Sequence, residues 1–196
     1  MSTIDNDHIG ASKPIIRRLW WHERDLFRDH LLRLGARDRR MRFGGHVTDE
    51  FIRHYAGDRD ILQRRLLGCF VDGELRGVGE FRLLGGYWPR EAELAFSVEA
   101  PFQERGIGSE LFRRTVTFAR NRGLERVFIT TLASNRPMQR MARRFGMRLR
   151  PCAGELEGRL ELVAPNYLSV MNEFLEEGVA LLWAAPRPVH ARDASL

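Results

Sequence analysis

The spacing of apolar residues divides the chain into segments of two kinds. Three short apolar runs, separated by Asp-Gly and Gly-Gly, are typical of antiparallel strands joined by tight turns: residues 66–71, 75–84 and 91–98. In the last run Leu94, Phe96 and Val98 occupy alternate positions, so that face is expected to lie in a core. Glu93 then lies on the opposite face of the same strand.

Apolar residues at helical spacing predict helices elsewhere in the chain. They cover residues 23–34, a segment that Thr48 caps, and residues 106–122, 135–145 and 166–184. In the last helix we expect the apolar positions to be buried, and any exposed part to be a candidate dimer surface: Leu168, Met171, Leu175 and Leu182. The basic segment 37–45, which ends in glycine, is interpreted as a loop.

Further strands are expected at residues 14–21 and 126–132 and around Leu149 and Leu160. The resulting order is strand, helices, antiparallel strands, helix, strand, helix, strands. It predicts an α/β (α+β) domain with a mixed, mostly antiparallel sheet of six to seven strands flanked by helices.

Composition adds limits to this picture. The chain has 196 residues and 43% hydrophobic content, which suits one domain over residues 14–185, with flexible ends at 1–13 and 186–196. No run approaches the ~20 apolar residues that span a bilayer, and no signal peptide is visible. Two distant cysteines and six histidines lack the spacing of metal ligands, so no metal is expected. A reducing, cytoplasmic location follows as the default.

The net charge of +6 favours anionic partners. Of the 32 basic residues only Lys13 is a lysine, and the arginines are scattered along the chain. Because they form no dense basic block, the pattern argues against a dedicated nucleic-acid-binding module. Binding that collapses steeply with salt would be the mark of such a module.

The segment with the clearest chemistry lies between the strand 91–98 and the helix 106–122. It contains Gly106-Ile107-Gly108-Ser109, preceded by Gln103 and Arg105. Glycine lets the backbone approach a ligand, and the first amides of a helix attract anions, so this junction suits a phosphate group. Ser109 adds a hydroxyl and Arg105 a cation. The alternative is a tight helix start without a ligand, and both Walker and Rossmann patterns are absent.

Four elements in register resemble the core signature of the GNAT acetyltransferases. They are residues 92–98, then Gln103-x-x-Gly106-Ile107-Gly108, then Asn135-x-x-Met138, then Phe145-Gly146-Met147. The sequence is most similar to the acetyltransferase domain of bacterial protein lysine acetyltransferases. The resemblance implies the GNAT fold, acetyl-CoA as co-substrate, and an amine acceptor, either a small molecule or a protein lysine.

The same resemblance assigns residues to the cofactor. The loop that follows Gln103 holds the pyrophosphate through backbone amides, the strand before it offers backbone groups to the pantetheine arm, and an asparagine lies near the acyl end. The implied residues are Phe96, Val98, Gln103, Arg105, Gly106, Ile107, Gly108, Ser109 and Asn135.

Amide formation requires a base that takes a proton from the amine. Glu93 is the first candidate, since it resembles the catalytic glutamate of the histone-acetylating branch, and Glu80 on the neighbouring strand is the second. Either carboxylate could instead pair with one of the many arginines. Many family members carry a tyrosine as general acid seven residues after the asparagine, where this chain has Ala142. That departure keeps open an acyl-CoA-binding sensor or regulatory protein without turnover.

Overall fold

The structure is a computed structural model that describes residues 13–58, 63–85 and 90–184, with side chains described as far as Val179. The strands are β1 (Ile15–Leu19), β2 (Arg64–Val71), β3 (Glu74–Leu84), β4 (Glu91–Val98), β5 (Arg126–Thr131), β6 (Arg148–Cys152) and β7 (Glu155–Glu161). The helices are α1 (Arg24–Arg33), α2 (Ala36–Phe43), α3 (Asp49–Gly57), α4 (Ile107–Asn121), α5 (Arg136–Arg144) and α6 (Tyr167–Ala184), with 3₁₀ turns η1 (Trp21–Glu23) and η2 (Ala100–Phe102).

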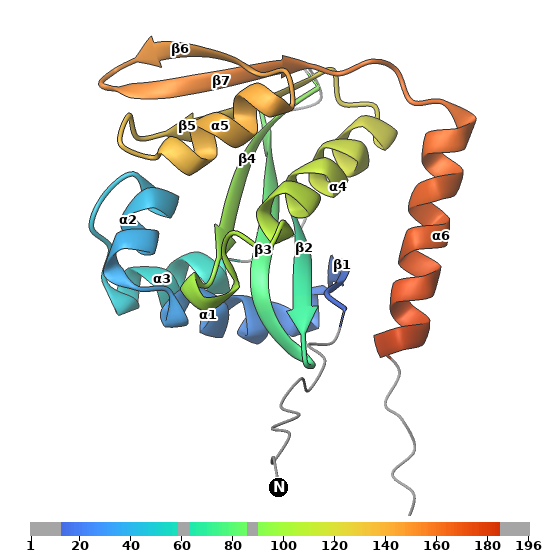
Figure 1. Ribbon diagram of the computed structural model, residues 1–196, viewed down its shortest axis with the longest axis horizontal. Coiled ribbons are helices and arrows are strands. Elements are labelled where there is room, and N and C mark those ends of the chain that lie inside the picture. The colour runs from blue at the N-terminus through green and yellow to red at the C-terminus, as the bar shows by residue number, and fades with distance from the viewer. Residues whose placement is uncertain (1–12, 59–62, 86–89, 185–196) are drawn as a thin grey trace, which may run out of the picture.

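The strands form one seven-stranded sheet in the order β1-β2-β3-β4-β5-β7-β6 (Figure 1). All neighbouring pairs are antiparallel except β4 and β5, which are parallel. The predicted mixed, mostly antiparallel sheet flanked by helices is therefore confirmed. The boundaries proposed for a single domain stay a prediction, because residues 1–12 and 185–196 lie outside the described part.

Each face of the sheet has its own hydrophobic core. On one face Leu94 and Phe96 of β4 pack with Leu111 and Phe112 of α4, as the alternation along β4 predicted. On the other face Phe27 and Leu31 of α1 and Ile52 of α3 pack with Val78 of β3. The strands therefore lie between two layers of helices, and β3 contributes residues to both cores, Phe81 to the first and Val78 to the second.

Two local predictions are confirmed. The β2–β3 hairpin turns at Asp72 and Gly73, whose φ angles of 52° and 81° are the left-handed values of a type I′ turn. Helix α3 begins after Thr48, whose hydroxyl accepts a hydrogen bond from the amide of Phe51 at 3.1 Å. The turn expected near Gly85 falls mainly on residues 86–89, which lie outside the described residues.

The prediction of a loop at residues 37–45 is wrong, because the segment forms α2. Its helical signal was missed since the segment is too polar to show an apolar period. Contacts with other segments stabilise it: the Arg39 side chain donates to the carbonyls of Leu32 and Leu34, and its guanidinium pairs with Asp49 at 2.6 Å. Gly44, at φ 76°, then ends the helix in the left-handed conformation.

The predicted burial of the apolar positions of α6 is also wrong. Leu168, Met171 and Leu175 are 74%, 39% and 61% exposed, and Leu182 lies outside the described side chains. The periodicity of these positions was correct, but α6 turns its other face towards the domain.

Within the described residues no helix combines the length and apolar character needed to cross a membrane. At the opposite end of the described chain, Lys13 is exposed just before β1.

Helix α4 approaches β3 closely at two glycines. A Cβ on Gly79 would lie 2.4 Å from the Thr115 hydroxyl oxygen and 3.1 Å from the Phe96 ring. A Cβ on Gly77 would lie 3.1 Å from Leu111. Since protein cores are close-packed, the absence of side chains at these positions sets the distance between α4 and the sheet.

Replacing Gly79 with alanine is therefore expected to destabilise the fold. Overpacking against Thr115 and Phe96 should lower the free energy of unfolding by about 1–3 kcal/mol, measured by denaturant titration. Gly35→Ala is the matched control, because a Cβ there has no neighbour within 4 Å, and it should change stability by less than about 0.5 kcal/mol. Equal effects of the two substitutions would contradict this packing argument.

Candidate active site

The parallel pairing of β4 and β5 is short. It joins Glu91 to Arg126, Ala92 to Val127 and Glu93 to Phe128 and then stops, although β4 continues to Val98. The two strands therefore diverge from Glu93 onward and leave an opening inside the sheet. Unpaired backbone groups inside a sheet need other partners, so this opening is a candidate ligand site.

The unpaired part of β4 directs backbone groups into the opening. The amide of Glu99 donates to the carbonyl of Arg76 on the β3 side at 2.9 Å, and the β3–β4 register is regular up to Gly77 and Val98. In an antiparallel ladder such pairs alternate, so the backbone groups of Phe96 and Val98 point away from β3, towards β5. This direction agrees with the predicted role of these two residues, which stays a prediction.

Three stacked aromatic rings support the opening from the α4 and α5 side. The Phe96 ring stacks on Phe112 of α4 at 5.0 Å between centroids, and Phe112 stacks on Phe145, just after α5, at 4.5 Å. Stacked rings of this kind stabilise beyond the area they bury. Because the stack links β4 to both helices, it holds the diverging strand in a fixed position.

The start of α4 has the features of an anion site. Gly106 adopts φ 81° as the N-cap residue, and no side chain caps the helix. Among the hydrogen bonds of the described residues, none is donated by the amides of Ile107, Gly108 or Ser109, and the first helical bond runs from Glu110 to Gly106 at 3.0 Å. These amides carry the positive end of the helix dipole.

The two glycines of this loop leave space around the backbone. A Cβ on Gly106 would meet nothing within 4 Å, and one on Gly108 would only touch Met141 and Val98 at 3.9 and 4.0 Å. Arg105 forms no ion pair among the described residues, and its guanidinium lies 5.5 Å from the centre of the Phe102 ring. The residues therefore supply free donors and a cation; binding of a phosphate group at this loop stays a prediction.

The Gln103 side chain holds the loop against β4 and α2 through hydrogen bonds. Its side-chain amide donates to the carbonyl of Val98 at 2.9 Å and to Asp38 of α2 at 3.1 Å. These bonds connect the loop both to the end of β4 and to the helix that the sequence did not predict. A direct contact of Gln103 with a cofactor remains a prediction.

Asn135 and Ala142 occupy structural positions on α5. The Asn135 side chain caps the helix by accepting from the amide of Met138 at 3.2 Å, which leaves its NH₂ group without a partner among the described residues. Ala142 is fully buried in the hydrophobic core that contains Phe112. The position at which the family resemblance implies a general acid therefore carries no hydroxyl in this chain.

Glu93 and Glu80 differ sharply in their surroundings. Glu93 is the last β4 residue paired with β5, is half-buried, and its side chain forms no hydrogen bond or ion pair with another described residue. It does interact electrostatically with Arg42 of α2. Burial opposes ionisation of that guanidinium, but the charged groups around it, Glu93 among them, raise the pKa of Arg42. Glu93 is thus a carboxylate available at the closed end of the opening.

Glu80 is instead held in an ion-pair cluster. It is only 2% exposed; Arg42 donates to one carboxylate oxygen, Arg64 lies 3.1 Å from the other, and the Tyr55 hydroxyl donates at 2.9 Å. Removing one member of a buried ion pair is costly, so this cluster fastens α2 and α3 to β3. With both oxygens engaged, the Glu80 carboxylate is less accessible to a bound amine than that of Glu93.

The sequence did not predict a second buried polar network. His30 of α1 is fully buried, with Nε2 2.9 Å from the Ser97 hydroxyl and Nδ1 3.1 Å from Glu99. Glu99 also accepts from Arg33 at 2.8 Å and Arg76 at 2.9 Å. Because Ser97 and Glu99 flank the end of β4, the network attaches α1 to the strand that leads into the anion site.

The pKa values of both His30 and Glu99 are lowered. Burial lowers the pKa of His30, against the raising effect of Glu99, so the ring is neutral, with Nδ1–H donating to Glu99. Burial alone would raise the pKa of Glu99, but hydrogen bonds from His30, Arg76 and Arg33 outweigh it and lower the pKa to about 2. The sequence held one signal for this pair, a histidine on the apolar face of a predicted helix.

A large hollow on β6 and β7 is separate from this site. Its volume is about 450 Å³, and its lining mixes both charges: Gly146, Arg148, Arg150, Glu157, Arg159, Leu160 and Glu161. It contains neither the start of α4 nor Glu93, so we assign no chemistry to it.

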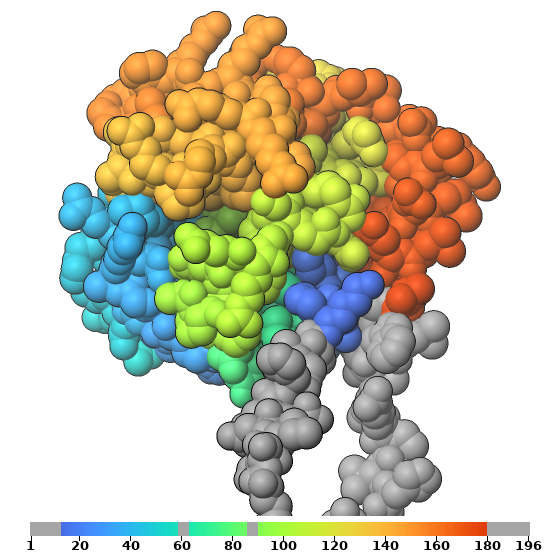
Figure 2. All heavy atoms as spheres, in the orientation of Figure 1, coloured from blue at the N-terminus to red at the C-terminus, as the bar shows by residue number. Residues whose placement is uncertain are grey.

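Among the described residues no group of three or more histidine, cysteine or acidic side chains could hold a metal ion. In Figure 2 a recess lies between α2, α5 and the beginning of α4.

Comparison with known proteins gives one family and many similar structures. The model of the family described as "Acetyltransferase (GNAT) family" matches residues 28–147. The GNAT domain of S. lividans PAT is 20% identical, with a TM-score of 0.65 over 75% of this chain and 89% of that one.

Two further similar structures contain coenzyme A. RimL, a ribosomal L7/L12 α-N-protein acetyltransferase, is 17% identical, with a TM-score of 0.64 over 79% of this chain and 97% of that one. The PaiA N-acetyltransferase of Thermoplasma acidophilum is 15% identical, with a TM-score of 0.58 over 76% and 99%. At these identities the likeness concerns the fold.

Acidification is expected to destabilise the protein through the His30 network. Below the ordinary histidine pKa of 6.5 the unfolded chain binds a proton that folded His30 does not, so stability falls as the pH falls, until the lowered pKa is reached. Glu99 adds a second loss between 4.5 and about 2. Thermal melts of His30→Gln should show a smaller loss between about pH 7 and 5 than wild type.

The matched control for this experiment is His54→Gln, which removes an exposed histidine of α3. It should keep the wild-type dependence of melting temperature on pH. A His30→Gln protein with the wild-type slope over the same range would contradict the assignment of His30 as a buried neutral histidine.

Proposed function

Because the chain belongs to the GNAT acetyltransferase family, we propose that it transfers the acyl group of an acyl-CoA, in the first instance acetyl-CoA, to a primary amine. The observation that carries this proposal is the shared position of three features. Strand β4 connects all three: it borders the β4–β5 opening, it carries the unpaired Glu93 at the closed end of that opening, and it leads to the uncapped start of α4 at the wide end.

The residues that would hold the co-substrate follow from this geometry. The amides of Ile107, Gly108 and Ser109, with Arg105 nearby, suit the diphosphate, and the backbone groups of Phe96 and the amide of Val98 suit the amide-containing arm. When bound, the thioester supplies an activated acyl carbon. The free NH₂ of Asn135 supports its predicted place near the acyl end.

Glu93 is proposed as the general base. An ammonium group cannot attack a carbonyl, so the acceptor first releases one proton to solvent; the neutral amine then attacks the acyl carbon and gives its second proton to the Glu93 carboxylate, directly or through one water, from which it passes to solvent or to the departing sulfur. The carbon–sulfur bond then breaks and sulfur leaves as a thiolate. A thiolate is a fair leaving group, so the missing hydroxyl at Ala142 is compatible with turnover.

The acceptor is proposed to approach from the α1 and α3 side, where Glu93 faces. There the end of α2 reaches β7, since a Cβ on Gly44 would lie 2.8 Å from the Glu155 carboxylate, and Phe128 and Thr130 of β5 are half-buried and exposed, respectively. We extend the proposal to protein amines, lysine among them, because two similar structures are named as PAT and as a protein α-N-acetyltransferase.

The two free thiols, Cys69 and Cys152, agree with the proposed location in a reducing cytoplasm.

The alternative is a protein that binds acyl-CoA without turnover, and Ala142 is the observation in its favour. Release of free thiol from acetyl-CoA, followed with a panel of amines, peptides and proteins, separates the two. Calorimetric binding of coenzyme A without any amine-dependent thiol release would support the sensor and contradict the enzyme.

Substituting Glu93 with glutamine tests the base. The variant keeps the size of the side chain but cannot take the proton, so amine-dependent thiol release should fall by about 10²–10⁴-fold, with coenzyme A affinity unchanged. Glu74→Gln, an exposed strand carboxylate, should retain wild-type activity. Glu80→Gln should instead mainly lower the melting temperature. Full activity of Glu93→Gln would exclude it as the base.

Substituting Gly108 with valine tests the anion site. A β-branched side chain would occupy the space in front of the free amides, so the Kd for coenzyme A should rise at least about tenfold, equivalent to ~1.4 kcal/mol. Gly57→Val is the control, since it adds the same side chain to a helical glycine with no neighbour within 4 Å. Unchanged affinity of Gly108→Val in titration calorimetry would remove the main support for the proposal.

A further inference from the structure

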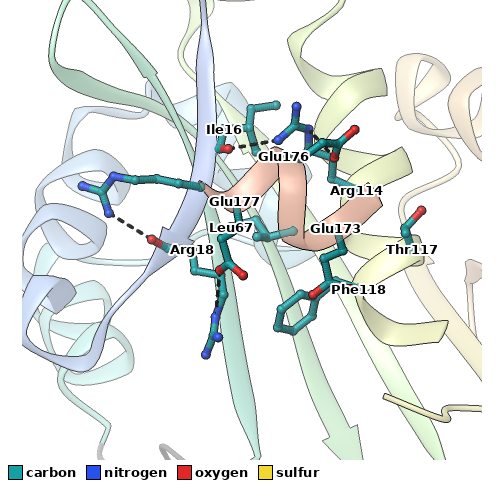
Figure 3. Close-up of a pocket in the computed structure, with 10 residues that line it drawn as sticks. Ile16, Arg18, Leu67, Arg114, Thr117, Phe118, Glu173, Glu176 and Glu177 are labelled. Carbon is teal, nitrogen blue, oxygen red and sulfur yellow. Dashed lines mark hydrogen bonds and ion pairs between the residues drawn. The ribbon is translucent and has the colours of Figure 1, made fainter. Parts of the chain in front are cut away.

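Helix α6 attaches to the domain through its polar side. Glu173 accepts from Arg122 at 2.6 Å, Glu176 from Arg113 at 2.9 Å, and Glu177 lies 3.6 Å from Arg18 of β1. Figure 3 shows these glutamates directed towards β1 and α4. The cavity they line is about 30 Å³, room for little more than a water molecule, so it offers no ligand site.

The opposite side of α6 is apolar and exposed. Two aromatic rings, two leucines, a methionine and a valine lie along it, and Val163 precedes it. Their exposed fractions are 77% for Tyr167, 74% for Leu168, 39% for Met171, 67% for Phe174, 61% for Leu175, 53% for Val179 and 79% for Val163. We call these seven residues the α6 stripe. A contiguous apolar surface of this kind on a water-facing helix marks an interaction site.

The spacing of the stripe suits a second helix. Leu168, Met171, Leu175 and Gly178 follow one another at intervals of three and four residues, the repeat that packs helices side by side. A Cβ on Gly178 would have no neighbour within 4 Å, so another helix could approach closely there. An apolar helical ridge with one small residue thus faces outward.

Charge restricts what can cover this stripe. Residues 167–184 contain no lysine or arginine, and all three of their acidic residues face the domain. A helix that lies on a membrane surface usually carries basic residues beside its apolar face, and α6 has none. A charged peptide would also find no partner on the stripe. The surface that complements it is another uncharged apolar helix.

We propose that the α6 stripe is the interface of a homodimer, covered by the same stripe of a second copy. An isologous contact needs a self-complementary patch, and a charge-free apolar ridge has that property. Tyr167 and Phe174 can each bury about 150–250 Å². With the five aliphatic residues, the stripe offers apolar area on the order of the ~800 Å² per partner of a stable interface.

The test is the mass of the full chain in solution. Sedimentation velocity across the micromolar range should give twice 22.7 kDa for wild type. A Leu168→Glu/Leu175→Glu double variant places two carboxylates in the interface and should weaken the dimer at least about 100-fold. Leu26→Glu, at a leucine of α1 that is 40% exposed, is the matched control and should remain dimeric.

Coenzyme A calorimetry and melting temperature accompany each variant. Because the stripe is remote from the opening, the double variant should bind coenzyme A as wild type does, which keeps this test independent of the proposed activity. A wild-type monomer throughout the range would overturn the proposal, as would a dimer that survives both glutamates. Monomers that sediment with anionic phospholipid vesicles would assign the stripe to a membrane surface and equally overturn it.

Discussion

The site depends on hydrogen bonds that are not made between two strands in the middle of a sheet. After Glu93 and Phe128 the β4–β5 ladder ends, and backbone groups that would otherwise pair face an opening. Unpaired backbone polarity is costly, so the surrounding fold must hold the strands apart. The Phe96–Phe112–Phe145 stack does so on one face, and the His30 network anchors the end of β4 on the other. The close approach of α4 to Gly79 of β3 sets the distance between that helix and the sheet.

Much of this arrangement followed from the sequence, because the signals were local. Alternation along residues 91–98 gave both faces of β4, Asp72-Gly73 gave the hairpin, and the glycines around Ile107 gave the helix start at which an anion site is proposed. Each of these features depends on neighbours within a few residues. Local patterns of this kind specify turns, strand faces and helix starts before any long-range contact forms.

The errors had a common physical cause, since they concern polar residues whose partners lie in other elements of the fold. Helix α2 depends on Arg39 and Arg42 reaching Asp49 and Glu80, and the network at His30 spans about seventy residues. The orientation of α6 depends on arginines of β1 and α4. Sequence spacing identified an apolar stripe on that helix but did not indicate which side faces the domain, because ion pairs set the orientation of α6.

The near-absence of lysine has a consequence for the protein as a target of its own chemistry. An enzyme that acylates amines is exposed to its own activated substrate, which can also acylate the amines of surface lysines. Here the cations that hold the fold together are guanidinium groups, which stay protonated and therefore do not act as nucleophiles. The exposed Lys13, ahead of β1, is the single lysine side chain. Among its side chains, the arginine-built domain therefore offers Lys13 as the one lysine that the proposed reaction could acylate.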